Sequence, residues 1–217
     1  MSEIKMVSQV ADTVAGMLLE IGAIKLNPDH PFTWASGWQS PIYCDNRLAL
    51  SYPKTRSYIK EMLSQEIKQY FPDVEAIAGV ATAGIPQGAL VSDQLSLPFI
   101  YVRSKAKGHG MENLIEGKVV PQQKVVVIED LISTGGSSLK AIYALQSAGF
   151  HVMGLAAIFS YGFPLADRNF QQERVKWFSL SNYEALINQA LNKNYIHEDK
   201  LDLLKNWQLK PDEWQPN

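Results

Sequence analysis

Residues 124–145, KVVVIEDLISTGGSSLKAIYAL, decide the fold. The run 124–128 is apolar at consecutive positions, which is typical of a strand buried on both faces. Residues 133–136 combine hydroxyl side chains with two glycines and indicate a loop, after which Leu139, Ile142 and Leu145 recur at helical spacing. Strand, loop and helix in this order form the repeating unit of a parallel α/β sheet.

The same alternation continues on both sides of this stretch. Short apolar runs occupy residues 76–80, 99–102, 125–128, 155–159 and 175–180, and helical periods lie between them at 84–95, 137–148 and 164–172. We therefore predict an α/β fold with a doubly wound parallel sheet and helices on both faces, over residues 55–180.

The flanking regions complete a single domain that we assign to residues 1–217. Residues 1–54 contain an amphipathic helix at 7–21 and a Trp-, Pro- and Gly-rich stretch at 28–47, which we expect to fold onto the sheet as a small hood. Residues 182–217 predict two further helices and an irregular end.

Composition excludes several classes of protein. Twenty basic and 22 acidic residues give a net charge of −2, so no strong positive field favours nucleic acid. Cys44 is the single cysteine, which allows no intrachain disulfide and fits a reducing compartment. Asp12 and Glu20 interrupt the first apolar stretch, so it lacks a signal-peptide core, and runs such as 152–159 are too short to span a bilayer. We expect a cytoplasmic protein without nucleic-acid or membrane partners.

The loop after residue 132 has the properties of a phosphate-binding loop. Ligands of open α/β sheets bind beyond the carboxyl ends of the strands, where this loop must lie. Its glycines let the backbone approach an anion, and the following helix start supplies free amide donors. Glu129 and Asp130 precede the glycines, and such acceptors suit ribose hydroxyls or a ligand-borne magnesium ion. An ordinary strand–helix turn with a capping pair would explain the acidic pair 129–130 alone, or the sequence TGG at 134–136 alone. It explains the two together, at this spacing in residues 124–145, less well.

This block resembles the phosphoribosyl-pyrophosphate signature of the type I phosphoribosyltransferases. The resemblance implies the type I phosphoribosyltransferase fold, with Glu129 and Asp130 on the ribose hydroxyls and the loop 133–137 on the 5-phosphate. The residues that it assigns to phosphoribosyl pyrophosphate here are Glu129, Asp130, Leu131, Ile132, Ser133, Thr134, Gly135, Gly136 and Ser137.

A basic segment, YVRSKAKGHGMENLIEG at residues 101–117, follows the second apolar run. Basic side chains between hinge-permitting glycines suit a lid that closes over pyrophosphate, although a solvated surface loop has the same composition.

The lid resembles the catalytic loop of the orotate phosphoribosyltransferases, which Arg103, Lys107, His109 and Gly110 match. Many members have a second Lys where this chain has Ser104, and Lys105 can supply that charge. The resemblance implies that Lys107 and His109, with Asp130, are catalytic. It also implies a homodimer in which the lid reaches the active site of the partner subunit.

A second strand–loop–helix unit, AGVATAGIP at residues 78–86, has only small side chains in its loop. By the same resemblance it is the pyrophosphate loop, with Thr82 and Ala83 at the contact positions. Close helix–strand packing is the plainer reason for these small residues.

The hood stretch FTWASGWQSPIYCDNR, residues 32–47, resembles the hood motif of the orotate enzymes. The resemblance implies that Tyr43 and Cys44 contact orotate together with Ser133. Two departures occur: Ala35 stands where some members have Lys, and Tyr161 and Gly162 stand near the place of an orotate-binding Arg. Hood aromatics such as Trp34 serve equally well as core.

Taken together, the resemblance implies transfer of a phosphoribosyl group from phosphoribosyl pyrophosphate to orotate, in pyrimidine nucleotide synthesis. It implies Mg²⁺ as the cofactor, carried by the pyrophosphate rather than by a protein metal site, and the histidines have no metal-ligand spacing. A purine phosphoribosyltransferase and a regulatory protein that senses phosphoribosyl pyrophosphate are the alternatives. The lid and hood disfavour the first, and the balanced charge disfavours the second.

Overall fold

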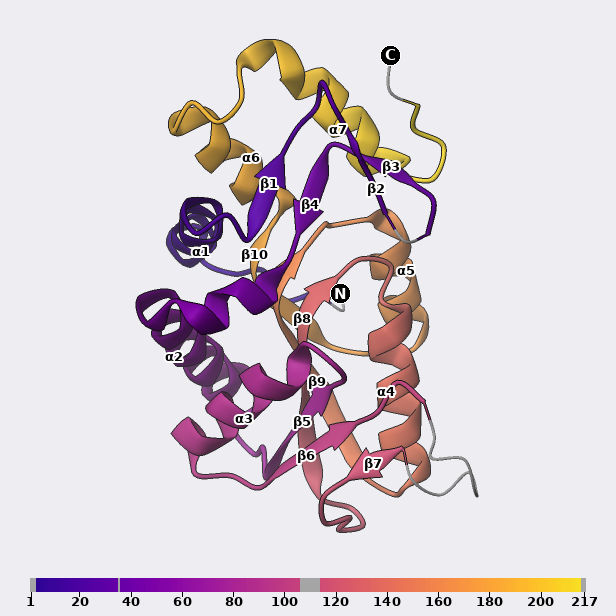
Figure 1. Ribbon diagram of the computed structural model, residues 1–217. Coiled ribbons are helices and arrows are strands. Elements are labelled where there is room, and N and C mark those ends of the chain that lie inside the picture. Colours follow the sequence, from indigo (N-terminus) through magenta and orange to yellow (C-terminus); the bar gives the residue numbers. More distant parts are fainter. Residues whose placement is uncertain (1–2, 35, 106–113, 216–217) are drawn as a thin grey trace.

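The structure is a computed structural model that describes residues 3–34, 36–105 and 114–215. In this part of the chain a six-stranded sheet has the order β10–β9–β8–β5–β6–β7 (Figure 1). Its strands are β5 (Ala76–Val80), β6 (Phe99–Val102), β7 (Ile115–Glu116), β8 (Lys124–Ile132), β9 (His151–Ser160) and β10 (Trp177–Asn182). All pair in parallel except β7, which runs antiparallel to β6. The predicted parallel sheet is confirmed. The antiparallel edge strand β7 was not predicted, because a strand of two residues gives no recognisable sequence pattern.

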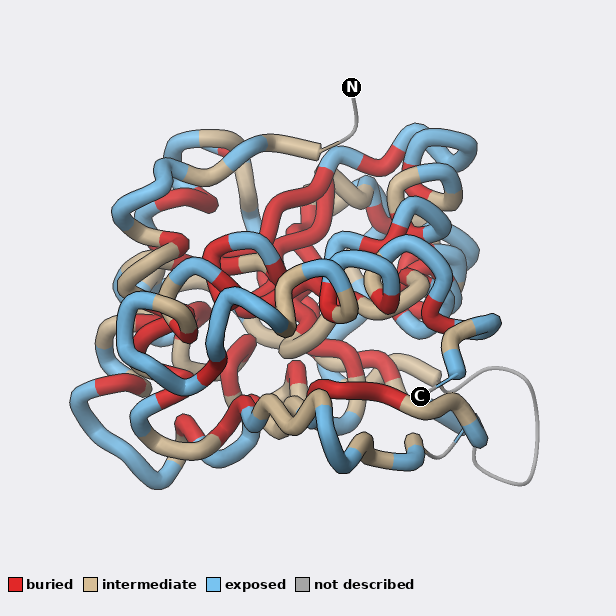
Figure 2. Tube along the Cα trace, turned by 90° about the horizontal axis from the view of Figure 1, so that it is seen from above, coloured by how far each residue is buried: buried red, intermediate tan, exposed pale blue. Residues whose placement is uncertain are grey.

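Helices cover both faces of this sheet, as predicted. The helices α1 (Ser8–Glu20), α2 (Pro53–Tyr70), α3 (Gly84–Leu95) and α6 (Tyr183–Asn192) share one core with Val126 and Ile128 of β8. The helices α4 (Gly136–Ser147) and α5 (Pro164–Gln172) share the other core with Val125 and Val127. Alternate residues of one strand thus enter opposite cores, which explains its unbroken apolar run. Figure 2 shows the buried residues gathered between the helical layers.

The hood lies beyond one end of the sheet (Figure 1). It contains the antiparallel pair β1 (Ile24–Leu26) and β4 (Ile42–Cys44), the hairpin β2 (Phe32–Thr33) and β3 (Gln39–Ser40), and the 3₁₀ helix η1 (Asn46–Ser51). After the short η2 (Glu198–Lys200), the helix α7 (Leu201–Leu209) packs against this hood. Trp207 is fully buried there, and its indole Nε1 donates to the Gln39 carbonyl oxygen at 3.3 Å. Segments from both ends of the sequence therefore build the hood region.

One expected boundary is wrong in a way that matters for the site. The predicted strand 124–128 continues to Ile132, because β9 pairs with it as far as Ile132↔Ser160. The polar pair Glu129 and Asp130 interrupted the apolar signal but not the strand. The predicted division into hood, core and tail stays a prediction. None of the helices in the described residues is long and apolar enough to cross a membrane.

Candidate active site

The candidate site lies where the chain direction of the sheet reverses. From β5 the chain crosses through α3 to β6 on one side, while β8 lies on the other side of β5 and leads on to β9 and β10. Such a switch point opens a crevice at the carboxyl ends of the strands. A pocket of about 340 Å³ lies there, which we call the ribose pocket. Its lining comes from the β5–α3 loop, the end of β8 and the hood: Ala81, Thr82, Ala83, Glu129, Asp130, Leu131, Ser137, Cys44, Asp45 and Arg47.

Glu129 borders this pocket because β8 continues beyond the last residue that pairs with β5. The last pair between these two strands is Gly79↔Ile128, so the edge of β8 beyond Ile128 is no longer covered by β5. The Glu129 side chain is nonetheless 95% removed from solvent, with 5% exposure. Its carboxylate accepts hydrogen bonds from the hydroxyls of Ser137 at 3.2 Å and Ser138 at 3.3 Å, and from the Asp130 amide at 3.1 Å. Burial and the adjacent Asp130 carboxylate together raise the pKa of Glu129 to about 8.

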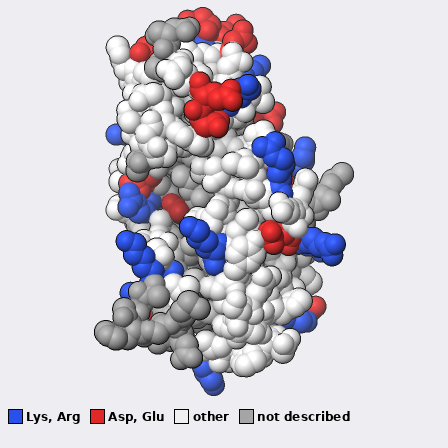
Figure 3. Space-filling view, turned by 90° about the vertical axis from the view of Figure 1, so that its right-hand side faces the viewer, with Lys and Arg blue, Asp and Glu red and all other residues white. Residues whose placement is uncertain are grey.

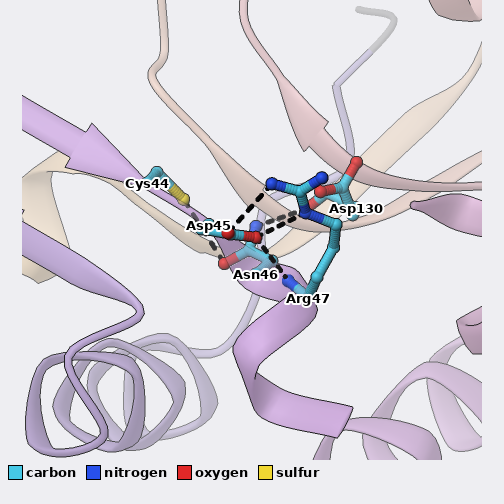
Figure 4. A network of polar contacts seen from close by, with 5 residues as sticks. All are labelled: Cys44, Asp45, Asn46, Arg47 and Asp130. Atoms are coloured by element: carbon cyan, nitrogen blue, oxygen red, sulfur yellow. Dashed lines mark hydrogen bonds and ion pairs between the residues drawn. The ribbon is translucent and has the colours of Figure 1, made fainter. Parts of the chain in front are cut away.

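Asp130 is held between the sheet and the hood (Figure 4). Its backbone carbonyl accepts a hydrogen bond of 2.7 Å from the Asn46 side-chain amide, and Asn46 itself is 1% exposed. Burial raises the pKa of the Asp130 carboxyl, and the Arg47 guanidinium opposes that shift. The side chain of Asp130 lines the ribose pocket, while its backbone carbonyl carries the hydrogen bond to the hood.

The phosphate loop 133–137 is supported from behind by α5. Gly135 has a φ of 80°, and a Cβ at this position would lie 2.8 Å from Cζ of Phe170. The Asn169 amide donates to the Thr134 carbonyl oxygen at 2.9 Å. Gly135 is also the N-cap of α4 and offers no side-chain cap, so the first amides of this helix are available to an anion.

The β5–α3 loop starts its helix in direct contact with β8. Ala83 is the N-cap of α3 and provides no side-chain cap. A Cβ on Gly84 would lie 2.4 Å from the Ile128 carbonyl oxygen, so only glycine fits. Thr82 is exposed, and the peptide bond between Ala81 and Thr82 is cis. The small residues permit close packing, and their role as a pyrophosphate loop stays a prediction.

A second pocket of about 280 Å³, which we call the base pocket, adjoins the first. Cys44 and Leu131 line both, and the other residues of the base pocket are Thr33, Trp34, Tyr43, Ser133 and Tyr161. The structure thus brings together the three predicted base contacts, Tyr43, Cys44 and Ser133. Burial raises the pKa of the Cys44 thiol well above its usual value, so this group is a neutral thiol.

An aromatic cluster forms the back wall of the base pocket. The rings of Trp34 and Tyr161 have centroids 5.1 Å apart, and Trp207 of α7 packs edge-on against both. The Gln208 side-chain amide also donates to the Tyr161 carbonyl oxygen at 2.9 Å. Trp34 therefore packs in the core and also lines the pocket. Packing in the core and contact with a ligand do not exclude each other for the aromatic residues of the hood.

The base of the lid is described, but its centre is not. The Arg103 amide donates to the Leu114 carbonyl oxygen at 2.7 Å, and the Arg103 guanidinium lies 3.4 Å from Oε1 of Glu116. Arg103 lines a cavity of about 560 Å³ that shares Ala81 and Ser137 with the ribose pocket. Lys105 is exposed, whereas Lys107, His109 and Gly110 lie outside the described residues.

Two further predicted residues are placed differently from their neighbours. Ile132 is 1% exposed and its side chain belongs to the core on the α4 side, so only its backbone can serve a ligand. Gly136 is exposed at the start of α4, and a Cβ there would come no closer than 3.9 Å to Thr134.

The charge of the ribose pocket is distinctive. Its described lining contains three carboxylates, Asp45, Glu129 and Asp130, and a single cationic side chain, Arg47. On the face seen in Figure 3, by contrast, acidic side chains gather toward the hood end and basic ones lie mainly over the middle.

The described residues contain no group of three or more His, Cys, Asp or Glu side chains that could hold a metal ion. Neighbouring carboxylates still suit a Mg²⁺ ion that arrives with a ligand, because this cation prefers oxygen ligands and keeps part of its shell from substrate phosphates.

Several residues of the site were missed by sequence reasoning. Asn46 and Arg47 belong to the quoted hood stretch, but no periodicity or spacing marks them. Asn169, Trp207 and Gln208 support the loop or the base pocket from segments that carry no motif. Their roles depend on contacts between distant parts of the chain, such as the 84 residues that separate Asn46 from Asp130.

Comparisons with known proteins agree with this geometry. A family model described as the phosphoribosyl transferase domain matches residues 51–187. Orotate phosphoribosyltransferase from Cytophaga hutchinsonii is 54% identical over 202 residues, covering 93% of this chain and 97% of that protein. The enzyme of that name from Porphyromonas gingivalis is 55% identical over 201 residues, covering 93% and 96%. The crystal structure of orotate phosphoribosyltransferase from Aeropyrum pernix superposes with a TM-score of 0.73 at 29% identity, over 85% of this chain and 99% of that one.

Proposed function

Because the chain belongs to the orotate phosphoribosyltransferase family of phosphoribosyl transferase domains, we propose that it transfers the phosphoribosyl group of phosphoribosyl pyrophosphate to orotate. The products are orotidine 5′-monophosphate and pyrophosphate, in pyrimidine nucleotide synthesis. The bond from the anomeric carbon to a pyrophosphate oxygen breaks, a bond from that carbon to an orotate ring nitrogen forms, and the proton of that nitrogen is released. The observation that carries the proposal is the junction of the ribose pocket and the base pocket along Cys44 and Leu131, because the new bond must form where the two ligands meet.

The ribose and its 5-phosphate fit the end of β8. Glu129 and Asp130 supply hydrogen-bonding oxygens for the vicinal hydroxyls, and the Asp130 carboxylate stabilises positive charge that develops on the sugar. The loop 133–137 and the free amides of α4 supply donors for the 5-phosphate. The rest of the predicted set, Leu131 and Ile132, contributes through the backbone that aims these groups.

The pyrophosphate fits the opposite wall of the ribose pocket. Thr82 and Ala83 precede the uncapped start of α3, so backbone amides are the donors on that side. Arg103, Lys107 and His109, with Lys105 as a further cation, complete the set from the lid. Their task is to exclude water and to neutralise the charge that grows as pyrophosphate leaves. Mg²⁺ enters bound to the pyrophosphate as part of the substrate.

The base pocket suits a planar pyrimidine. Tyr43, Trp34 and Tyr161 offer aromatic faces, while Ser133 and Thr33 offer hydroxyls at its edge. Orotate in this pocket presents its ring toward the ribose pocket across Leu131.

The decisive experiment measures the loss of orotate absorbance on adding phosphoribosyl pyrophosphate and magnesium. We expect turnover with orotate, none with adenine, hypoxanthine or guanine, and none in excess chelator. Turnover of a purine instead would favour the purine phosphoribosyltransferase. Binding of phosphoribosyl pyrophosphate without consumption of any base would favour the regulatory protein.

We further propose a cytoplasmic homodimer that binds no nucleic acid and whose lid enters the partner's active site. Each of the single variants Lys107→Ala and Asp130→Asn should be nearly inactive as a homodimer. A mixed dimer should regain activity, because one of its two sites then combines wild-type Lys107 with wild-type Asp130 from different chains. Co-expression with different tags isolates the mixed dimer for the orotate assay. Activity no higher than that of either parent, or a monomeric protein in solution, would refute the shared site.

A further inference from the structure

Arg47 is the residue of the ribose pocket that the proposed function leaves without a task. It stands in η1 directly after the hood strand β4, and its side chain reaches the pocket beside Asp130 (Figure 4). Asp45 holds one edge of its guanidinium, with Nε 2.7 Å from Oδ1 and Nη2 2.9 Å from Oδ2. Asp45 also accepts the Arg47 backbone amide at 3.2 Å, so side chain and backbone are fixed by the same carboxylate.

This two-point contact leaves most of the donor capacity of Arg47 unused. A guanidinium has five N–H donors, and the contact with Asp45 occupies one on Nε and one on Nη2. The other three, on Nη1 and Nη2, have no partner among the described hydrogen bonds. The side chain is 61% exposed while that of Asp45 is 20% exposed, so the arginine is oriented but still accessible.

The chemistry of the pocket indicates what the free edge receives. A ligand with several phosphate charges has to enter a pocket whose described lining carries the carboxyl groups of Asp45, Glu129 and Asp130, and Arg47 is the cation in that lining. Arginine suits phosphate oxygens because its planar edge donates two parallel hydrogen bonds. Arg47 lines the ribose pocket together with Thr82 and Ala83, and it is not part of the base-pocket lining. The pyrophosphate is thus the nearer anion, rather than the orotate carboxylate.

Resting on the proposed function, we propose that Arg47 is a pyrophosphate-binding residue that Asp45 pre-orients from the hood. It provides a cation that belongs to the rigid wall of the site, whereas the basic residues of the lid must close over the ligand. The Asn46 between Asp45 and Arg47 donates to the Asp130 carbonyl oxygen, which ties the pair to the end of β8.

The test compares Arg47→Ala, Arg47→Lys and the control Arg168→Ala. Arg168 is an exposed arginine of α5 that lines neither pocket, so its loss controls for net charge. Calorimetry measures the affinity of each folded variant for magnesium pyrophosphate alone, and the orotate assay measures KM for both substrates. Arg47→Ala should weaken pyrophosphate binding and raise the KM for phosphoribosyl pyrophosphate by about tenfold or more, the scale of one lost hydrogen bond to a charged group. The KM for orotate should change less than about threefold. The variant Arg47→Lys should recover only part of the lost affinity, because an ammonium group cannot donate the two parallel hydrogen bonds of a guanidinium edge.

Three outcomes would overturn the inference. Unchanged pyrophosphate affinity in folded Arg47→Ala would reduce the pair with Asp45 to a surface ion pair. A rise confined to the KM for orotate would move Arg47 to the base. An equal effect of Arg168→Ala would make the effect one of general charge. If the wild-type chain consumes no orotate, the proposed function fails, but the pyrophosphate titration still decides the role of Arg47.

Discussion

The two strand–loop–helix units that form the ribose pocket, β5–α3 and β8–α4, share a topology but not a chemistry. The helix α3 lies against the sheet through Gly84 and Gly88, whose added Cβ atoms would meet Ile128 at 2.4 Å and Phe99 at 2.7 Å. By contrast, α4 packs through the large side chains of Leu139, Ile142 and Leu145. The first unit is close-packed and has small residues in its loop, whereas the second has two acids at the end of its strand and hydroxyl side chains in its loop.

This difference shows how one architecture supplies two kinds of binding wall. A loop squeezed between a close helix and its strand has little room for side chains and serves a ligand with backbone amides. A loop under a more distant helix has room for functional groups and for the α5 side chains that support it. Four substitutions test this contrast.

Gly84→Ala should produce the largest effect, on folding itself. The new Cβ would overlap the backbone oxygen of Ile128, which no rotamer change can relieve. We expect a loss of about 3 kcal/mol in the free energy of unfolding, the upper end for overpacking, or failure to fold. Urea denaturation of the ligand-free protein measures it. The matched change Gly136→Ala in the other unit has 3.9 Å of clearance and should alter stability by less than about 1 kcal/mol. Equal losses would mean that the two helices are not packed differently.

Asp130→Asn should affect chemistry rather than folding. The link to the hood uses the backbone carbonyl of Asp130, which the substitution retains. The charge that faces the ribose is lost, and we expect kcat/KM for phosphoribosyl pyrophosphate to fall about 10²-fold, as for removal of one preorganised electrostatic group. Steady-state kinetics beside a thermal melt separate the two effects. Normal kinetics in a folded variant would assign this carboxylate to surface capping.

Glu129→Gln should change the pH dependence of stability. The pKa of Glu129 is raised from 4.5 to about 8 in the folded chain, so between these values the folded state holds a proton that the unfolded state has lost. Wild-type stability should therefore fall as pH rises from about 4.5 to 8. The variant lacks this loss and should gain about 1 kcal/mol or more on the wild type by pH 9. Denaturation at a series of pH values measures the difference. Parallel curves for the two proteins would show that Glu129 does not carry the proton.

Thr82→Ala should have the smallest effect. If the β5–α3 loop acts through its amides, removing this exposed side chain should change kcat/KM less than about threefold. The orotate assay at varied phosphoribosyl pyrophosphate measures it, with Asp130→Asn as the reference for a functional side chain. A loss on the scale of that reference would contradict the division of labour between the two loops.

The core of the fold was predictable because β5, β8 and β9 each contain a continuous apolar run with a helical period after it. The strand β5 and the helices α3 and α5 begin and end at the predicted residues. The extension of β8 through Glu129 and Asp130 was not predictable, because it depends on the length of the neighbouring β9. The polarity of a residue indicates the surroundings of its side chain. It does not indicate how far the neighbouring strand extends, and that length decides where β8 ends.

The candidate site divides in the same way. Tyr43, Cys44 and Ser133 share a pocket as expected, since a recognisable motif carries each of them. Arg47 and Trp207 have no such mark. The indole of Trp207 reaches the hood across 168 residues of sequence, and such a contact exists only once the sheet has fixed the distance between its ends.

The seating of α7 on the hood has an evolutionary consequence. The groups proposed for the sugar phosphate lie at the ends of the central strands and in the loops that continue them. Part of the wall of the base pocket belongs instead to the periphery, because Trp34 of the hood lines it and Trp207 of α7 packs against Trp34 outside the sheet. Selection can reshape that wall for a different acceptor while the inherited sugar-phosphate machinery is left unchanged. A duplicated copy of such a gene therefore has a short route to a new nucleobase.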